Sequence, residues 1–252
     1  MIISHKHRFI FVKTAKTAGT SLEVFLAKHC GEDDIITPTF PLVEGHRPRN
    51  YRGSFWPFPE LFSFNYPRDK SLFCERRFFT PVQTFRDCVR RWRYHEHIPA
   101  RVLKMRVDPE IWDGYHKFTI ERDPWDKTIS HYHMQRSYRD GELSFDQYLD
   151  EGTFAVNYPF YTDRDGSLLV DQVIRYEELA AELGKLCERW GIPYEGTLGV
   201  RAKGGYRTDR RPYTEVYTPE QAERVGKIFE REIALHGYRF GGTVESEGGT
   251  IP

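Results

Sequence analysis

One stretch near the start of the chain constrains the fold more than any other. Residues 9–12 form an apolar run that is typical of a buried strand. Residues 22–29 repeat apolar positions at helical spacing, and Gly31 is expected to end that helix. A loop of small and hydroxyl residues joins the two elements. This order favours an anion site, because the backbone N–H groups at the start of a helix have no intrahelical acceptor.

The loop supplies side chains as well as backbone donors. Lys16 adds a positive charge, and Thr17, Thr20 and Ser21 add hydroxyl donors. The pattern differs from the common nucleotide-binding loop, which has its lysine directly after the second glycine, whereas here Lys16 precedes Gly19. The sequence therefore predicts a phosphate site and disfavours an ATPase.

A second phosphate-site pattern lies near the middle of the chain. Residues 117–121 are typical of a strand, and Asp123 and Pro124 fit the N-cap and first position of a following helix. Arg122 is then expected at the carboxyl end of the strand, where ligands bind in open α/β sheets. Ser130 falls about two turns into the helix.

These two motifs, in this order, resemble those of the PAPS-dependent sulfotransferases. The Lys-Thr-Ala-Gly-Thr-Ser-Leu form of the first loop resembles the carbohydrate branch of bacterial type. The resemblance extends to residues 174–179 and 236–240, and it matches poorly between residues 50 and 90. It implies a P-loop-like three-layer α/β fold, PAPS as the sulfuryl donor, PAP as the product, no metal, and a hydroxyl acceptor that is most often a saccharide or polysaccharide.

The resemblance also implies which residues bind the donor. The first loop is expected to hold the 5′-phosphosulfate, with Lys16 as the catalytic cation, and the second motif is expected to hold the 3′-phosphate. A late basic loop often closes over the 3′-phosphate in such enzymes, and Arg211 stands where that contact is expected. The cofactor-binding set is therefore Lys16, Thr17, Ala18, Gly19, Thr20, Ser21, Arg122, Ser130 and Arg211.

The acceptor hydroxyl needs a base, and in the carbohydrate branch a His or Glu between the two motifs commonly serves. Histidine suits this role because its unperturbed pKa lies near neutrality. His46, His95 and His97 lie in that interval. The His97-Ile98-Pro99-Ala100 segment resembles a His-Met-Pro-Ala segment of the family, so His97 is the expected base and His46 the alternative. Lys13 is a second, less favoured cation at the end of the first strand.

The pattern along the chain predicts one α/β domain. Strands alternate with helices, which favours a central, mostly parallel sheet flanked by helices. A helix is expected over residues 179–190. A last helix is expected to start after Thr218 and to end at Gly237. The domain is expected to span residues 1–240, and residues 241–252 are expected to form a flexible tail.

The composition of the chain limits the classes of molecule that it is expected to bind. Lys plus Arg and Asp plus Glu number 37 each, so the formal net charge of zero argues against a broad nucleic-acid or membrane-binding surface. The four cysteines lack C-x-x-C spacing, and no metal-ligand spacing is found. No apolar run approaches membrane length and no signal peptide is evident, so a cytoplasmic enzyme is expected.

Two other functions fit parts of the same pattern. One is a small-molecule kinase or other P-loop NTPase, and the other is a non-catalytic PAP- or glycan-binding protein of the same fold. The aromatic residues of segment 51–85 could contact a sugar, anchor a long loop or form a subunit contact. The acceptor and the oligomeric state are left open by the sequence.

Overall fold

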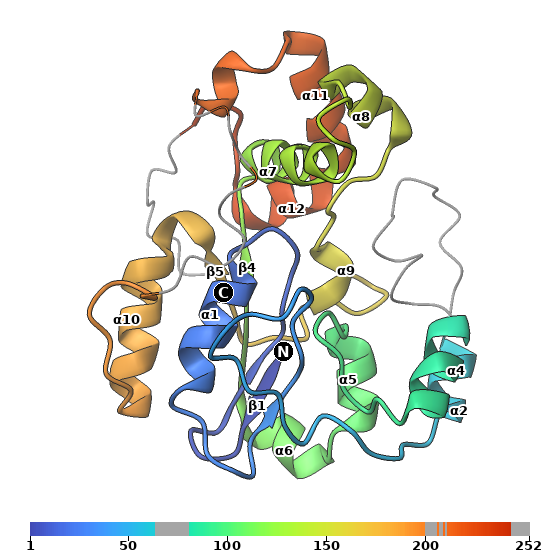
Figure 1. Ribbon diagram of the computed structural model, residues 1–252, viewed down its shortest axis with the longest axis vertical. Helices are drawn as coiled ribbons and strands as arrows, with labels where there is room; N and C mark the ends of the chain where they lie inside the picture. The colour runs from blue at the N-terminus through green and yellow to red at the C-terminus, as the bar shows by residue number, and fades with distance from the viewer. Residues whose placement is uncertain (64–80, 200–205, 207–208, 210, 243–252) are drawn as a thin grey trace.

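A five-stranded sheet forms the centre of the computed structural model, which describes residues 1–63, 81–199, 206, 209 and 211–242 (Figure 1). The order of the strands across the sheet is β3-β1-β2-β4-β5. The strands are β1 (Ile2–Ser4), β2 (Phe9–Phe11), β3 (Ile35–Ile36), β4 (His116–Glu121) and β5 (Gln172–Arg175).

The sheet is mixed. β2, β4 and β5 are parallel to one another, whereas β1 pairs in the antiparallel direction with both β2 and β3. The α/β fold class is confirmed, with the parallel pairing confined to three strands. β1 and β3 were not predicted, because the apolar runs at residues 1–3 and 35–36 are shorter than the four-residue run at residues 9–12. The parallel strands bring the segments that follow β2, β4 and β5 to one edge of the sheet.

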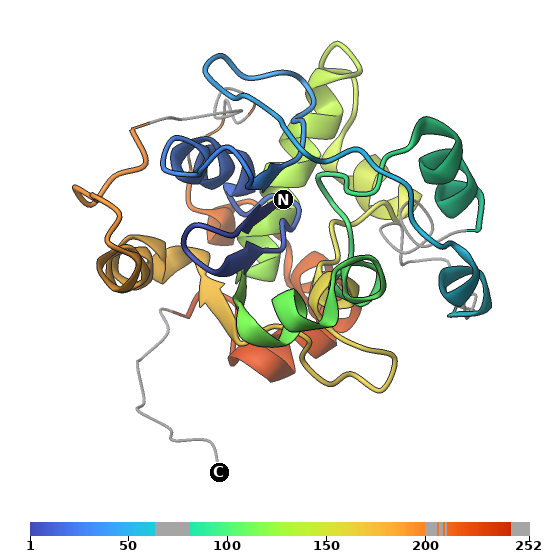
Figure 2. The same ribbon diagram turned by 90° about the horizontal axis from the view of Figure 1, so that it is seen from below.

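Helices cover both faces of the sheet, which gives three layers (Figure 2). Alternate residues of β2 point to opposite faces, because side chains alternate along a strand: Phe9 and Phe11 face one layer and Ile10 faces the other. The first layer contains α1 (Gly19–Ala27) and α10 (Leu179–Trp190). The second contains α5 (Ala100–Arg106), α6 (Pro109–Gly114) and α9 (Tyr158–Tyr161).

A further helical group lies beyond the end of the sheet, at the top of Figure 1. It consists of α7 (Pro124–Ser137), α8 (Phe145–Glu151), α11 (Pro219–Ile228) and α12 (Glu230–His236). Its core includes Trp125, Tyr148, Val225 and Phe229, all buried. This group holds the start of α7, and therefore the second motif, against the sheet edge.

Two predicted helix starts are confirmed, but the predicted last helix differs from the observed structure. The side chain of Asp123 accepts the first N–H groups of α7, and Thr218 forms the expected capping box at the start of α11. The predicted last helix is two helices, broken at Phe229 (φ −103°, ψ 22°). After the break, the carboxylate of Glu232 lies in the core and accepts the N–H of Asn157 at 3.1 Å. The helical pattern of this segment depends only on neighbouring residues, so it gives no sign that Glu232 must accept from Asn157, 75 positions away.

The remaining helices, α2 (Phe58–Ser63) and α4 (Pro81–Arg90), lie beside α5. Buried Arg106 joins all three, because its guanidinium donates to Glu60 at 2.6 Å and to Asp87 at 3.1 Å. Single 3₁₀ turns occur at Tyr176–Glu178 and Tyr213–Glu215. Within the described ranges, no helix is both long and apolar enough to cross a membrane.

Candidate functional site

The loop between β2 and α1 has an unusual backbone. Lys16 (φ 63°) and Ala18 (φ 58°) both adopt the left-handed conformation, which non-glycine residues rarely take. The carbonyl of Ala18 accepts the N–H of Leu22 at 3.1 Å, so the helix begins there and the N–H groups before Leu22 belong to its open end. Such an alternation of backbone conformations turns successive N–H groups toward one point, which suits an anion.

The next residue, Gly19, has little room for a side chain. A Cβ atom at Gly19 would lie 3.0 Å from Cγ of Lys13 and 3.4 Å from the carbonyl oxygen of Thr14. The loop and the start of α1 are therefore packed directly on the end of β2. This packing keeps the start of the helix close to the sheet edge, where the second motif ends.

The left-handed conformation of Ala18 makes a prediction about stability. Replacement Ala18→Gly should raise the free energy of unfolding by about 0.5–1 kcal/mol, because glycine has no Cβ to oppose φ near 58°. The same chemical change at exposed Ala181, inside α10, should instead lower it by about 1 kcal/mol. Urea denaturation of both variants checks the pair, and a destabilised Ala18→Gly protein would contradict the argument.

The second motif lies against this loop. Arg122 follows β4, and its Nη1 donates to the carbonyl oxygen of Lys16 at 3.2 Å. The same guanidinium donates to Asp126 through Nε at 3.0 Å, and it lies over the ring of Tyr176 at 4.5 Å. The structure thus brings the two predicted motifs together, with the guanidinium held at their junction by an ion pair and an aromatic face.

The side chain of Lys16 extends toward α7. Its Nζ lies 3.6 Å from Sδ of Met134 and 5.7 Å from the centre of the Tyr206 ring. Ser130 stands one turn before Met134 on α7, so both lie on the same helix face. Lys16 therefore contacts the face of α7 that also carries Ser130, the residue predicted from the second motif.

A residue that the sequence analysis missed holds the first loop. The amide of buried Asn157 accepts the N–H of Ala15 at 2.9 Å and donates to the carbonyl of Ala15 at 3.0 Å. It also donates to Glu121, whose carboxylate pairs with buried Lys127 at 2.6 Å. No motif surrounds Asn157 in the sequence; only the buried position of an amide next to a loop identifies it.

The histidine candidates separate by their contacts. Nδ1 of His97 lies 3.1 Å from the carbonyl oxygen of Lys13, directly at the first loop, and its side chain is 18% exposed. His46 is buried, with Nε2 at 2.7 Å from the carbonyl of Thr37. His95 lies 3.6 Å from Asp87, and burial lowers its pKa well below the usual range.

The other two predicted groups have different surroundings. Lys13 is buried and its Nζ contacts Glu23 at 2.7 Å and Glu96 at 2.9 Å, so its charge is compensated by two carboxylates. The guanidinium of Arg211 donates to Asp209 at 2.7 Å and the side chain is 60% exposed. The rest of the Lys203–Arg210 stretch lies outside the described residues, apart from Tyr206 and Asp209.

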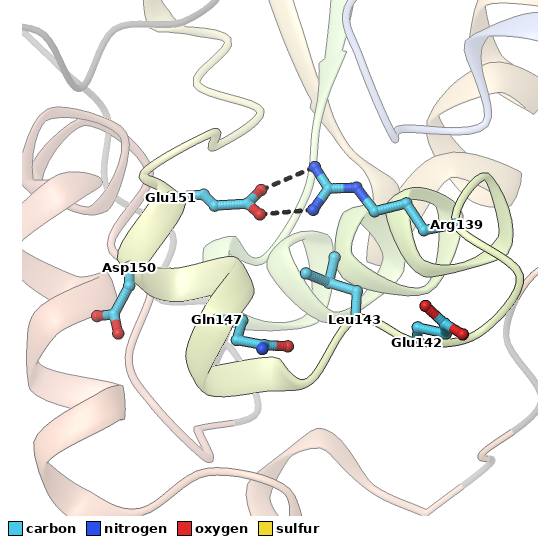
Figure 3. Close-up of a pocket in the computed structure, with 6 residues that line it drawn as sticks. All are labelled: Arg139, Glu142, Leu143, Gln147, Asp150 and Glu151. Carbon is cyan, nitrogen blue, oxygen red and sulfur yellow. Dashed lines mark hydrogen bonds and ion pairs between the residues drawn. The ribbon is translucent and has the colours of Figure 1, made fainter.

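An open pocket of about 400 Å³ lies elsewhere, between the end of α7 and α8 (Figure 3). Arg139 and Glu151 form a two-pronged ion pair across it, at 2.5 and 2.9 Å. Its lining contains none of the predicted site residues. In the part of the chain that the structure describes, no group of three or more His, Cys, Asp or Glu side chains could hold a metal ion.

Comparisons with known proteins give a sequence relative and a structural neighbour. No family model matches the chain. An uncharacterized protein of Archaeoglobus fulgidus is 35% identical over 109 residues, which are 41% of this chain and 89% of that protein. A crystal structure of a sulfotransferase from Alicyclobacillus acidocaldarius covers 89% of this chain and 96% of its own, at 17% identity and a TM-score of 0.33. The chain belongs to the family of the archaeal protein, whose description states no activity.

Proposed function

We propose that this protein is a sulfotransferase that moves a sulfuryl group from PAPS to a hydroxyl of a carbohydrate acceptor. One observation carries the proposal: Arg122 donates to the carbonyl of Lys16, which joins two phosphate-site patterns that lie 106 residues apart. A donor with phosphates at its 5′ and 3′ positions needs two such sites side by side.

The residues present fit this donor. The missing Cβ of Gly19 lets the start of α1 pack on Lys13 and Thr14, and the left-handed residues before it orient N–H groups toward one place. A lysine, an arginine and several hydroxyls supply the charge and the donors that phosphate and sulfate oxygens accept. Gly19 and Ala18 thus contribute shape, whereas Lys16 and Arg122 contribute charge.

The roles follow from these positions. PAPS supplies the sulfuryl group and, in its 5′-phosphate, the leaving group. Lys16 and the N–H groups of residues 17–21 stabilise the negative charge that develops on the bridging oxygen. Arg122 and Ser130, with Arg211 from the late loop, hold the 3′-phosphate.

The acceptor is activated by His97. Its Nδ1 lies beside a carbonyl oxygen, so Nδ1 carries the proton and Nε2 keeps its lone pair. Burial lowers the pKa of His97 to about 4, although nearby Glu96 opposes this, so the ring is neutral at neutral pH. The acceptor hydroxyl gives its proton to Nε2 as its oxygen bonds to sulfur and the sulfur–phosphate oxygen bond breaks.

A carbohydrate acceptor agrees with exposed aromatic rings in the segment between the two motifs. The exposed ring of Phe40 lies 6.3 Å from Trp92, and Trp92 begins the segment that leads to His97. Exposed Trp56 and Phe58 form a second ring pair at 4.8 Å. Aromatic faces of this kind present apolar surface against which a sugar ring can stack.

Isothermal calorimetry with PAP tests the proposal. We expect micromolar binding of PAP without magnesium, at least about tenfold tighter than binding of ATP or adenosine 5′-phosphosulfate. ATP and PAP differ in where the phosphates sit, and adenosine 5′-phosphosulfate lacks the 3′-phosphate. Magnesium-dependent preference for ATP would favour a kinase instead, and PAP binding without transfer to any saccharide would favour a binding protein.

A further inference from the structure

Lys13 lies at the end of β2 with its side chain turned away from solvent. The side chain is 2% exposed, and its Nζ bridges Glu23, which is fully buried, and Glu96, which is 16% exposed. Burial alone lowers the pKa of Lys13, but the two carboxylates outweigh it and raise the pKa overall. The lysine is therefore charged and already occupied by carboxylates, which makes it a poor phosphate ligand.

The same residue also contacts the proposed base through its backbone. The carbonyl oxygen of Lys13 lies 3.1 Å from Nδ1 of His97. A carbonyl can only accept, so this contact requires the proton on Nδ1 and leaves Nε2 as the basic atom. Nε2 in turn lies 4.0 Å from Oε2 of Glu96, the carboxylate oxygen that accepts the Lys13 ammonium.

We propose that Lys13 is a positioning residue for the His97–Glu96 pair: its carbonyl fixes the tautomer of His97, and its ammonium holds Glu96 beside Nε2. The value of this arrangement for catalysis rests on the proposed function, but the arrangement itself belongs to the free protein. The ammonium compensates Glu96, so the carboxylate does not draw a proton onto the imidazole in the ground state.

The charges around His97 determine in which direction its pKa should change when a neighbouring charge is removed. Glu96 is adjacent in the chain, Lys13 follows β2, the amino group of Met1 adds a weaker positive charge, and His95 lies on the same segment. Burial lowers the pKa of His97 most, Glu96 raises it, and Lys13 lowers it. Removal of Lys13 should therefore raise this pKa, and removal of the Glu96 charge should lower it.

NMR titration of histidine-labelled protein, without ligand, tests this. The His97 signals are assigned from their loss in His97→Gln. In the wild-type protein we expect a midpoint near pH 4 and a nitrogen spectrum with the proton on Nδ1. In Lys13→Met the midpoint should rise by about one pH unit or more, whereas in Glu96→Gln it should fall.

Lys13→Met leaves Glu96 without its cation and leaves Glu23 paired only with the amino group of Met1, so the variant could fail to fold. The double variant Lys13→Met/Glu23→Gln removes one positive and one negative charge and still leaves Glu96 uncompensated, so an upward shift is again expected. A proton on Nε2 of His97 in the wild-type protein would overturn the proposal. So would a midpoint that stays within about 0.3 pH unit in a folded variant lacking Lys13.

Calorimetry separates this inference from the proposed function. PAP should bind wild-type protein and the folded Lys13 variant with affinities within about threefold at pH 8, because Lys13 is not assigned a phosphate contact. If PAP fails to bind either protein, the proposed function is wrong, and the NMR titration still decides the role of Lys13. If PAP binding is lost only in the Lys13 variant, Lys13 serves the donor site and the positioning role is rejected.

Discussion

Replacement Lys16→Ala should lower turnover at least about a hundredfold, which corresponds to roughly 3 kcal/mol of lost transition-state stabilisation. The ammonium belongs to a loop whose backbone is already shaped for an anion, with Lys16 itself in the left-handed conformation. In the proposed mechanism, charge on the leaving oxygen therefore loses the ammonium of Lys16. The measurement is the release of PAP from PAPS in the presence of a saccharide acceptor found by screening.

A matched control uses the same helix. Lys28 is exposed and caps the opposite end of α1, so Lys28→Ala changes the same charge without touching the loop. This control should keep turnover within about twofold of the wild-type value, because exposed lysines contribute little. A Lys16→Ala enzyme that retains more than about a third of wild-type turnover would remove Lys16 from catalysis.

Replacement Arg122→Ala should weaken PAP binding by about thirtyfold, or roughly 2 kcal/mol, because a two-pronged, charge-assisted contact with the 3′-phosphate is lost. Binding of adenosine 5′-phosphosulfate, which has no 3′-phosphate, should change by less than about threefold. Arg122→Lys should not restore affinity, since an ammonium cannot reproduce the planar fork of the guanidinium. Calorimetry with the two nucleotides measures both effects.

The ion pair between Arg122 and Asp126 provides a control variant that should not weaken PAP binding. Asp126 accepts from Arg122 at 3.0 and 2.5 Å, so its carboxylate competes with an incoming phosphate for the same donors. Asp126→Asn should therefore bind PAP at least as tightly as the wild-type protein, because a repelling negative charge is removed. Unchanged PAP affinity in Arg122→Ala would disprove the assignment of the 3′-phosphate site.

Much of the scaffold around the site could be predicted because its signals are local. The strand at β2, the start of α7 after Asp123 and the capping box at Thr218 each depend on residues within one turn of one another. The residues that define these elements interact with close sequence neighbours, so the elements can be predicted without knowing the rest of the chain. The break at Phe229 shows the limit, because it serves a contact between Glu232 and a distant loop.

The site itself was only partly predictable. Lys16, Arg122 and His97 stand in recognisable patterns, but Asn157 has no neighbouring pattern, and the parts of Asn157 and Glu96 follow from tertiary contacts with Ala15 and Lys13. The expected part of Arg211 in the 3′-phosphate site stays a prediction, because much of its loop lies outside the described residues.

The sequence by itself determined the strand–loop–helix unit around Lys16, the arginine at the end of a strand and the α/β class, because these depend on residue type, spacing and backbone geometry over short distances. Tertiary structure alone decided that β2 and β4 are neighbours, which sets the guanidinium of Arg122 on the carbonyl of Lys16. It also decided that Lys13 faces two carboxylates instead of solvent. The physical reason is that strand pairing and burial depend on interactions throughout the chain, and they determine which charged residues, distant in sequence, come into contact.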